Sequence, residues 1–142
     1  LCLDATRTGD ITDTGIIWRN KKVNRSLSTV SIDPETGLLF VSDFSGFVHC
    51  IDAETGKTFW THDLKAHVWP GGTLVADGKV YIGDEDGDFV VLSATKAKRL
   101  ISECNVNAPI YSTPVVANGV LYIQSTMHLF ALQDLTLRST GK

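Results

Sequence analysis

The chain has 142 residues, of which 43% are hydrophobic and 20% are charged, and it carries a net charge of −3. A chain of this length buries roughly two thirds of the surface that its unfolded form exposes, and this composition excludes a disordered protein. The small negative charge argues against a nucleic-acid-binding protein, because neutralising phosphates needs a concentrated basic surface, and apolar runs of at most four residues exclude a transmembrane helix.

The strongest signal in the sequence is an internal repeat. Gly37, Gly78 and Gly119 are 41 residues apart, and each is followed by a similar apolar segment. The matching segments are 39–41 (LFV), 80–82 (VYI) and 121–123 (LYI). Three consecutive copies at one spacing indicate a protein built from repeated structural units.

Each copy predicts short β-strands joined by turns, beginning with an inner strand. The expected inner strands are 28–32, 73–76 and 113–117, and the second strands are 38–42, 79–83 and 120–124. The expected third strands are 47–51, 88–92 and 129–132, and an outer strand follows at 57–62. Four antiparallel strands in a period of about 40 residues are typical of one blade of a β-propeller.

The connections between these strands support an all-β fold. Asp77-Gly78 and Asn118-Gly119 are strong signals for two-residue hairpin turns, in which both central residues take a positive φ. The segment 94–100 is rich in good helix formers. Because the repeat aligns it with the turn and outer strand of the preceding copy, we expect no helix there.

The whole chain, 1–142, is therefore predicted to be a single β-propeller segment of about three four-stranded blades. The expected parts are the end of a preceding blade at 1–20, two blades at 26–66 and 67–107, and an incomplete blade at 108–142 with a weak fourth strand at 135–138. Propellers typically close with about four to eight blades, so we expect this chain to belong to a longer propeller. The alternative is that two copies close a six-bladed ring, with 16–19 of one chain completing the last blade of the other.

The segment 50–60, with the sequence CIDAETGKTFW, resembles the blade signature A-x-D-x-x-T-G-K-x-x-W of the PQQ-like propeller family. That family includes quinoprotein alcohol dehydrogenases and the outer-membrane assembly lipoprotein BamB. Residues 2–9 followed by Trp18 are similar with an insertion, whereas the other copies lack the tryptophan and Ser93 replaces one aspartate. The resemblance implies a propeller of seven or eight blades, located in the periplasm or otherwise outside the cytoplasm.

In that family the signature has a structural role and does not itself bind a cofactor. The aspartate and the Thr-Gly turn join the third strand to the fourth, and the tryptophan packs between adjacent blades. The resemblance therefore implies structural roles for Asp4, Gly9, Trp18, Asp52, Thr55, Gly56 and Trp60.

Candidate binding residues lie in the linkers that lead into the inner strands, because such linkers surround the mouth of a propeller's central channel. Arg25, His67, Trp69 and Tyr111 occupy these positions and would together recognise a small molecule or an extended peptide. The alternative is that Trp69 and Tyr111 fill the gaps between blades.

No metal site is expected. Asp84, Asp86 and Asp88 alternate as in a calcium loop, but the segment lacks the glycine at position six and the distal glutamate of an EF-hand. The repeat places these aspartates in an ordinary turn, equivalent to 43–46.

Other reactive residue types suggest packing rather than chemistry. His49 and His128 stand next to apolar residues of the third strands and are expected to be packed rather than catalytic. Cys2, Cys50 and Cys104 form no CxxC pair and are expected to be buried free thiols.

The leading hypothesis is a non-catalytic scaffold that binds a protein or peptide, with β-strand addition as one mode. Further partners would be the remaining blades or a second copy, and no cofactor is expected in this chain. The sequence lacks a nucleophile elbow, GxGxxG, Walker loop and HExxH motif, and it lacks the adjacent cysteines that quinoprotein dehydrogenases use. The alternatives are a fragment of a dehydrogenase that uses pyrroloquinoline quinone (PQQ) with calcium, and a structural accessory subunit of a membrane-associated assembly.

Overall fold

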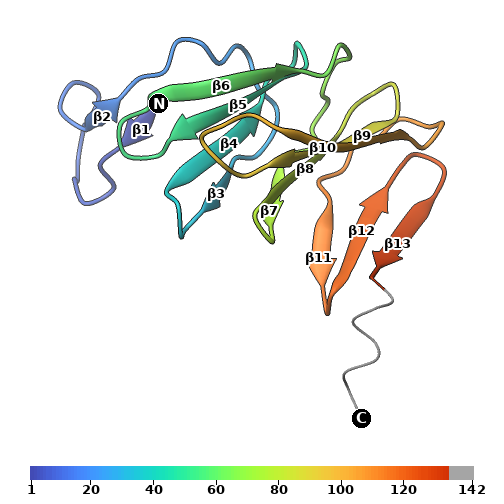
Figure 1. Cartoon of the computed structure of the whole chain (residues 1–142). Helices are drawn as coiled ribbons and strands as arrows, with labels where there is room; N and C mark the ends of the chain where they lie inside the picture. The colour runs from blue at the N-terminus through green and yellow to red at the C-terminus, as the bar shows by residue number, and fades with distance from the viewer. Residues whose placement is uncertain (135–142) are drawn as a thin grey trace.

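The computed structural model describes residues 1–134 and contains thirteen β-strands and no helix within that range (Figure 1). The strands are β1 (Cys2–Leu3), β2 (Ile16–Trp18), β3 (Ser31–Asp33), β4 (Leu38–Ser42), β5 (Phe47–Asp52), β6 (Thr58–Asp63), β7 (Leu74–Ala76), β8 (Lys79–Gly83), β9 (Asp88–Ser93), β10 (Leu100–Asn105), β11 (Val115–Ala117), β12 (Val120–Gln124) and β13 (Leu129–Gln133). No part of the described chain is a helix with the length and hydrophobicity needed to cross a bilayer.

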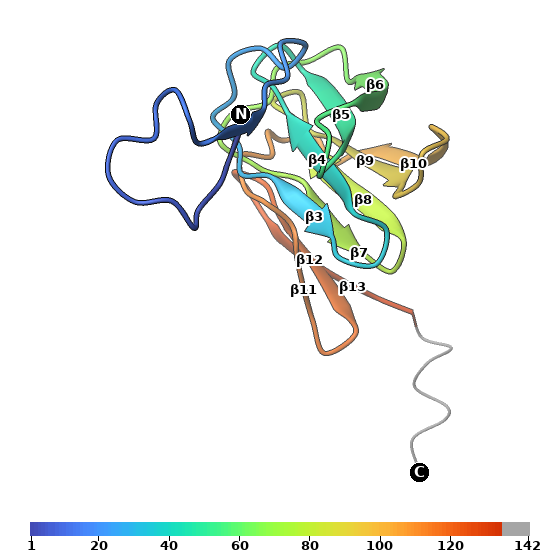
Figure 2. The same ribbon diagram turned by 90° about the vertical axis from the view of Figure 1, so that its left-hand side faces the viewer.

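The strands form four antiparallel sheets that follow one another along the chain. Their orders are β1-β2, β3-β4-β5-β6, β7-β8-β9-β10 and β11-β12-β13, so every neighbour in a sheet is also the next strand in sequence. The inner strands β3 and β7 lie side by side (Figure 1, Figure 2), and Ser31 Oγ is 2.6 Å from Thr73 Oγ1 at this contact. This arrangement confirms the predicted β-propeller segment, while the weak strand expected at 135–138 lies outside the described residues.

The hairpin turns have the predicted backbone conformation. Asp77 and Gly78 have φ angles of 50° and 64°, and Asn118 and Gly119 have 51° and 72°. Positive φ at both central residues is the requirement of a type I′ turn. The second strands therefore begin and end at the predicted residues in all three repeats.

The first of the inner strands begins later than predicted. The expected strand at 28–32 is observed at Ser31–Asp33, because side-chain hydrogen bonds replace strand pairing before it. Ser26 Oγ donates to the carbonyl oxygen of Ser42 over 2.7 Å, and the backbone N–H of Ser28 donates to Ser26 Oγ over 3.1 Å. In the third copy, β11 begins directly after Pro114, which has no N–H to donate.

The segment 94–100 forms a loop that leads into β10, as the repeat predicts. The carbonyl oxygen of Ala97 accepts hydrogen bonds from Ser93 Oγ and Thr95 Oγ1, at 3.2 and 2.8 Å. The backbone N–H of Ser93 also donates to the carbonyl oxygen of Arg99 over 2.9 Å. These contacts turn the chain back on itself, so local helix propensity does not determine the structure here.

The hydrophobic core lies between sheets. Leu38, Phe40, Val48, Cys50 and Trp60 from one sheet pack against Val80, Ile82, Val90 and Leu92 from the next, and all are buried. Because a four-stranded sheet has no interior of its own, burial of these side chains depends on contact between neighbouring sheets.

A tryptophan on the outer strand connects each of the first two sheets to the next one. Trp18 Nε1 donates to the carbonyl oxygen of Ala53 over 3.0 Å, and Trp60 Nε1 donates to that of Thr95 over 2.7 Å. Both acceptors lie in the turn between the third and fourth strands of the following sheet. The tryptophans thus lie between adjacent blades, as the family resemblance implies.

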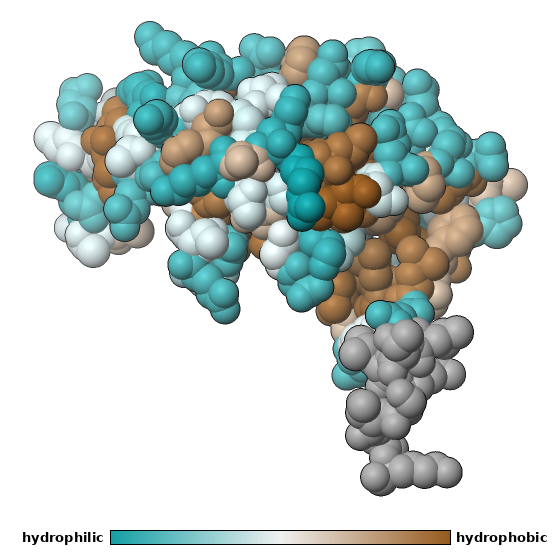
Figure 3. All heavy atoms as spheres, viewed as in Figure 1, coloured by the Kyte–Doolittle hydropathy of each residue, from teal (hydrophilic) through white to brown (hydrophobic). Residues whose placement is uncertain are grey.

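The third sheet lacks this tryptophan, and the sheet that follows it is less buried. Ser102 in β10 pairs with Val91 as Trp60 pairs with Cys50, so a serine occupies the tryptophan position. Leu132 pairs with Leu121 in β12, and the equivalent residues of the two earlier sheets are Leu92 and Ile51. Leu92 and Ile51 are 0% and 2% exposed, whereas Leu132 is 51% exposed. Figure 3 shows the resulting apolar surface, in brown, over β11–β13.

Turn residues of the signature also form local hydrogen bonds in this chain. Asp52 Oδ1 accepts hydrogen bonds from the backbone N–H groups of Glu54 and Thr55, at 3.1 and 2.9 Å. Asp4 Oδ1 accepts one from Thr6 N over 3.0 Å. Gly9 has a φ of 79° with open space around its Cα, so it serves the turn rather than packing.

Gly56 is required by both its conformation and its neighbour. Its φ is 73°, and a Cβ atom there would lie 2.6 Å from two ring carbons of Trp18. Gly37 has a similar φ of 67° but nothing within 4 Å of the same point. A side chain at Gly37 would therefore meet backbone strain alone, whereas one at Gly56 would also collide with the Trp18 ring.

Substituting Trp60 with alanine should lower the free energy of unfolding by about 3–5 kcal/mol, because it leaves a cavity between two sheets. Urea unfolding followed by circular dichroism measures this loss. Trp69→Ala is the matched control, since Trp69 is 40% exposed and its removal leaves no cavity. Equal losses in the two variants would contradict the role of Trp60 between the sheets.

Gly56→Ala should be clearly more destabilising than Gly37→Ala. Both variants carry the cost of a non-glycine residue at positive φ, about 1 kcal/mol, but only Gly56→Ala also pushes against the Trp18 ring, which adds about 1–3 kcal/mol. Thermal unfolding of the two variants in parallel provides the comparison, and a smaller loss for Gly56→Ala would show that Trp18 does not need this close contact.

Candidate functional site

The linkers and the second turns of the sheets meet at one end of each sheet. Phe44 N donates to the carbonyl oxygen of Arg25 over 2.8 Å, and Glu85 N donates to that of His67 over 3.1 Å. The same bond recurs in the third sheet between Thr126 N and the carbonyl oxygen of Pro109, at 2.9 Å. We call the surface formed by linker residues 25–27, 67–69 and 109–111 and turns 43–46, 84–87 and 125–128 the mouth surface.

Five side chains gather in the mouth surface, and we call them the aromatic cluster: Arg25, Phe44, His67, Trp69 and Glu85. The centre of the Phe44 ring lies 5.0 Å from that of His67 and 5.1 Å from that of Trp69, the latter edge to face. The guanidinium carbon of Arg25 lies 5.5 Å from the centre of the Phe44 ring. Aromatic edge-to-face and cation–π contacts at these distances are favourable.

Glu85 fixes two rings of the aromatic cluster. Trp69 Nε1 donates to Glu85 Oε2 over 2.7 Å, and His67 Nδ1 is 2.7 Å from Glu85 Oε1. Partial burial raises the pKa of Glu85, but the hydrogen bonds from Trp69 and His67 outweigh burial and hold this pKa below its usual value. Because Trp69 is still 40% exposed, an oriented aromatic ring remains available at the surface.

The repeat also places an exposed apolar residue at the same point of each linker. Leu27, Trp69 and Tyr111 each stand two residues after the linker carbonyl that accepts the hydrogen bond from the second turn. They are 44%, 40% and 43% exposed. Neither aromatic residue is buried between sheets, in contrast to the gap-filling alternative.

Three of the four candidate residues from the sequence are brought together. Arg25, His67 and Trp69 belong to the aromatic cluster, whereas Tyr111 lies one repeat further along the mouth surface. Sequence reasoning missed Phe44 and Glu85. The signal that could have found them is the repeat itself, because each directly follows the aspartate of an equivalent turn.

Beneath the mouth surface, turn 43–46 contains a buried polar network. Asp43 is fully buried, and its Oδ2 is 3.0 Å from His49 Nε2. His49 Nδ1 lies 3.2 Å from Thr61 Oγ1. With the ring proton on Nε2, His49 donates to Asp43 and accepts from Thr61. His49 is therefore packed, as predicted, whereas His128 is exposed with its ring centre 5.8 Å from that of Phe130.

Turn 84–87 has an equivalent aspartate, Asp84, but no histidine hydrogen-bonded to it. Asp84 is 1% exposed, and its Oδ1 accepts from Asp86 N and Asp88 N at 3.1 and 2.9 Å. Val90 stands where the first sheet has His49, and Asp84 Oδ2 has no hydrogen-bond partner among the described residues. Burial raises the pKa of Asp84 to about 6, and the nearby charges of Asp88 and Asp86 act in the same direction.

The acidic turn does not resemble a metal site in its geometry. Asp88 Oδ1 accepts from Asn105 Nδ2 over 2.8 Å, and Asp84 Oδ1 is occupied by backbone N–H groups. Within residues 1–134, no group of three or more His, Cys, Asp or Glu side chains is arranged to hold a metal ion. The arrangement of Asp84, Asp86 and Asp88 is explained by the turn.

The cysteines are all free, and they differ in exposure. Cys50 is buried, and burial raises the pKa of its thiol to about 12, so it is not a nucleophile at neutral pH. Cys2 is partly buried. Cys104 is exposed on β10, which corrects the expectation of a buried thiol, because no further strand covers β10 within the described residues.

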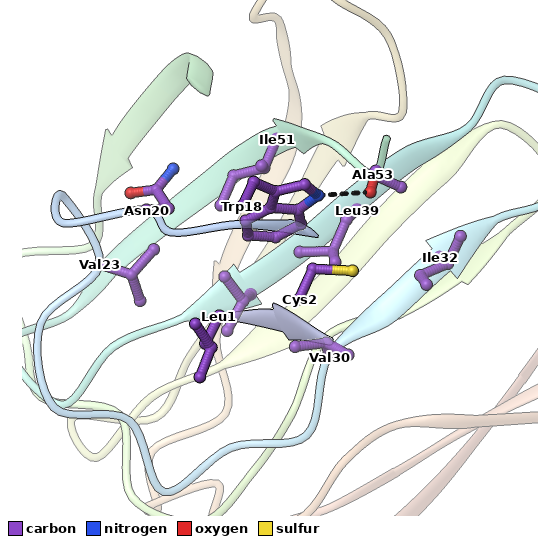
Figure 4. A pocket seen from close by; sticks show the side chains of 11 residues that line it. Leu1, Cys2, Trp18, Asn20, Val23, Val30, Ile32, Leu39, Ile51 and Ala53 are labelled. Atoms are coloured by element: carbon purple, nitrogen blue, oxygen red, sulfur yellow. Dashed lines mark hydrogen bonds between the residues drawn. The ribbon is translucent and has the colours of Figure 1, made fainter. Parts of the chain in front are cut away.

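An apolar pocket of about 300 Å³ lies away from the mouth surface, between the β1-β2 pair and the sheet β3-β6 (Figure 4). Leu39, Val41 and Ile51 line it together with Trp18. In the next sheet, the equivalent residues Val80, Ile82 and Leu92 are buried against side chains of β4, β5 and β6. The pocket is therefore a gap between sheets rather than a candidate active site.

Comparison with known proteins identifies the family. A family model described as outer membrane protein assembly factor BamB matches residues 44–139, which is more than half of the chain. The chain belongs to this PQQ-like β-propeller family. The recognition of the signature at 50–60 is thereby confirmed.

Curated relatives of this PQQ-like chain include proteins with different functions. It is 28% identical over 109 residues to a quinohemoprotein alcohol dehydrogenase from Comamonas testosteroni, covering 69% of this chain and 15% of that protein. It is 29% identical over 98 residues to the outer membrane protein assembly factor BamB from Yersinia pestis, covering 62% of this chain and 25% of that protein. The chain thus spans a quarter or less of these relatives.

Solved structures show the same fold. The crystal structure of BamB from Moraxella catarrhalis matches with a TM-score of 0.57 and 20% identity, over 73% of this chain and 29% of that one. The quinohemoprotein alcohol dehydrogenase ADHIIG from Pseudomonas putida HK5 matches with a TM-score of 0.61 and 21% identity, over 75% and 17% of the two chains. At these identities the likeness concerns the fold alone.

Replacing His49 with valine should lower the free energy of unfolding by about 3–5 kcal/mol, because it leaves the buried carboxylate of Asp43 without its partner. Chemical denaturation at neutral pH measures this loss. Thr61→Val is the control, since it removes only the outer member of the network and should cost about 1 kcal/mol. If the two variants lose the same stability, the Asp43–His49 pair is not the important contact.

Proposed function

We propose that this chain is part of a non-catalytic PQQ-like β-propeller that binds a protein or peptide partner at the mouth surface. The observation that carries the proposal is the aromatic cluster. Trp69 is exposed by 40% yet held in place by Glu85, so a partner meets an aromatic ring that is already oriented. Rigid, partly exposed aromatic residues with an adjacent arginine are typical of the central contacts in protein interfaces.

The relatives support a role in protein binding. One curated relative and one similar structure are named BamB, and the former is described as an outer membrane protein assembly factor. An assembly factor acts on other polypeptides by definition. This relationship supports a location outside the cytoplasm.

A second candidate function is supported by a different relative. The similarity to a quinohemoprotein alcohol dehydrogenase over 109 residues favours a segment of a PQQ-dependent enzyme. The residues of this chain do not match a PQQ site with adjacent cysteines and bound calcium. Cys2, Cys50 and Cys104 are not adjacent in sequence, and residues 1–134 offer no group of three ligands for calcium. We therefore derive no catalytic step for this chain.

Selection of a phage-displayed library of random peptides on this chain tests the proposal. Enriched peptides should bind Trp69→Ala about 30-fold more weakly or worse, the loss typical of removing a central aromatic contact. Ile101→Ala is the matched control, because Ile101 is also 40% exposed but lies on β10. Fluorescence polarisation with labelled peptide measures both affinities.

Two results would contradict the proposal. One is a set of peptides whose affinity falls equally in Trp69→Ala and Ile101→Ala, which would place binding elsewhere. The other is stoichiometric binding of PQQ in the presence of calcium, seen as a bound chromophore, which would favour the dehydrogenase alternative.

A further inference from the structure

We propose that the buried carboxyl group of Asp84 makes the aromatic cluster sensitive to pH, and that the cluster is held most firmly when this carboxyl group carries a proton. This inference rests on the proposed function, because it concerns the regulation of the same mouth surface. The repeat places two equivalent buried aspartates, Asp43 and Asp84, within one chain.

Asp43 and Asp84 occupy equivalent turns in nearly identical geometry. Oδ1 of Asp43 accepts from the backbone N–H groups of Ser45 and Phe47, at 3.0 and 3.2 Å. Oδ1 of Asp84 accepts from the equivalent groups of Asp86 and Asp88, at 3.1 and 2.9 Å. The aspartates are 0% and 1% exposed. The two aspartates are therefore equally buried, and Oδ1 of each accepts the same pair of backbone hydrogen bonds.

The second oxygen distinguishes the two sites. In turn 43–46, Oδ2 of Asp43 is 3.0 Å from His49 Nε2, which donates a hydrogen bond to it. At turn 84–87, Val90 stands where the other sheet has His49, and Oδ2 of Asp84 has no hydrogen-bond partner among the described residues. A buried carboxylate without a partner is costly, so the neutral acid is the favoured form.

Among the described residues, the charged groups that act most strongly on Asp84 are Asp88 and Asp86, whose negative charges do not offset this preference. Its own turn contributes Glu85, Asp86 and Asp88, which are all acidic. The facing strand β10 contributes Glu103, which pairs with Val90. The following linker contributes Val106, Ala108 and Ile110, which do not titrate, and the preceding linker contributes His67 through its contact with Glu85.

Asp84 is also connected to the aromatic cluster through its backbone. Its carbonyl oxygen accepts from Ile110 N over 2.9 Å, which ties the turn to the linker of the third sheet. The next residue, Glu85, donates its N–H to the carbonyl oxygen of His67 and orients the His67 and Trp69 rings. A change in how firmly Asp84 holds the turn therefore reaches both rings of the mouth surface.

The direction of the effect follows from the pKa of Asp84, which burial raises from 3.8 to about 6. A raised pKa means that this group's stabilising contribution is complete below about pH 4 and is lost as the pH rises through 6. Above pH 6 the turn contains a buried carboxylate without a partner. The aromatic cluster is then held less firmly, and peptide binding should weaken.

Two measurements on the whole chain test the inference. The ¹³C resonance of the Asp84 carboxyl group should titrate with a midpoint near pH 6, and Trp69 fluorescence should change with the same midpoint. The fluorescence of a Trp69→Phe variant gives the background from Trp18 and Trp60. The fluorescence transition should disappear in Asp84→Asn, which keeps the size of the side chain but cannot titrate.

The controls separate Asp84 from the histidine nearby. His67→Gln should retain the fluorescence transition, because the titrating group is still present. Val90→His should lower the carboxyl midpoint towards the usual aspartate range by restoring the partner that Asp43 has; if this variant does not fold, Asp84→Asn and His67→Gln still decide. A carboxyl midpoint near 4 in the unmodified chain, or a transition that is lost in His67→Gln and kept in Asp84→Asn, would overturn the inference.

Peptide affinity on the two sides of pH 6 distinguishes this inference from the proposed function. A selected peptide should bind more tightly below pH 6 in the unmodified chain and equally at both values in Asp84→Asn. Binding that depends on Trp69 but not on pH would refute the regulation and leave the binding function intact. A carboxyl and fluorescence transition at pH 6 without any selected peptide would refute the binding function and leave the pH-sensitive turn intact.

Discussion

The structure depends on contact between neighbouring sheets, and at two junctions a tryptophan of one sheet packs against the next sheet. A tryptophan on the outer strand packs against the next sheet and donates a hydrogen bond to its turn, as Trp18 and Trp60 do. Since a single four-stranded sheet has no interior, such contacts supply the burial that a compact domain normally obtains from two packed layers. In the sheet that follows Ser102, Leu132 is exposed although its equivalents Leu92 and Ile51 are buried.

Much of this fold could be predicted from the sequence because its turns are chemically specific. Asp77-Gly78 and Asn118-Gly119 fix the hairpins, and the hairpins fix the second strands. The start of β3 could not be predicted in the same way, since the hydroxyl of Ser26 satisfies backbone groups through contacts between residues far apart in sequence. Loop 94–100 shows the reverse case, in which the repeat is more informative than local propensity.

The candidate site could be predicted only in part. Arg25, His67 and Trp69 could be assigned to the mouth surface from the position of their linkers, but Phe44 and Glu85 come from turns that lie 16 to 25 residues away from their partners. The difference between His49 and Val90 is visible in the sequence as a single substitution between repeats. Its meaning depends on the burial of Asp43 and Asp84, which the sequence alone does not give.

The serine at position 102 also affects the cooperativity of unfolding. In a row of sheets where each element is stabilised mainly by its neighbour, the weakest junction sets the point at which the array separates into parts. We expect that junction to lie between β10 and the sheet β11–β13, so the amide hydrogens of β11–β13 should exchange with solvent before those of the two sheets joined by Trp60, which should unfold as a single cooperative unit.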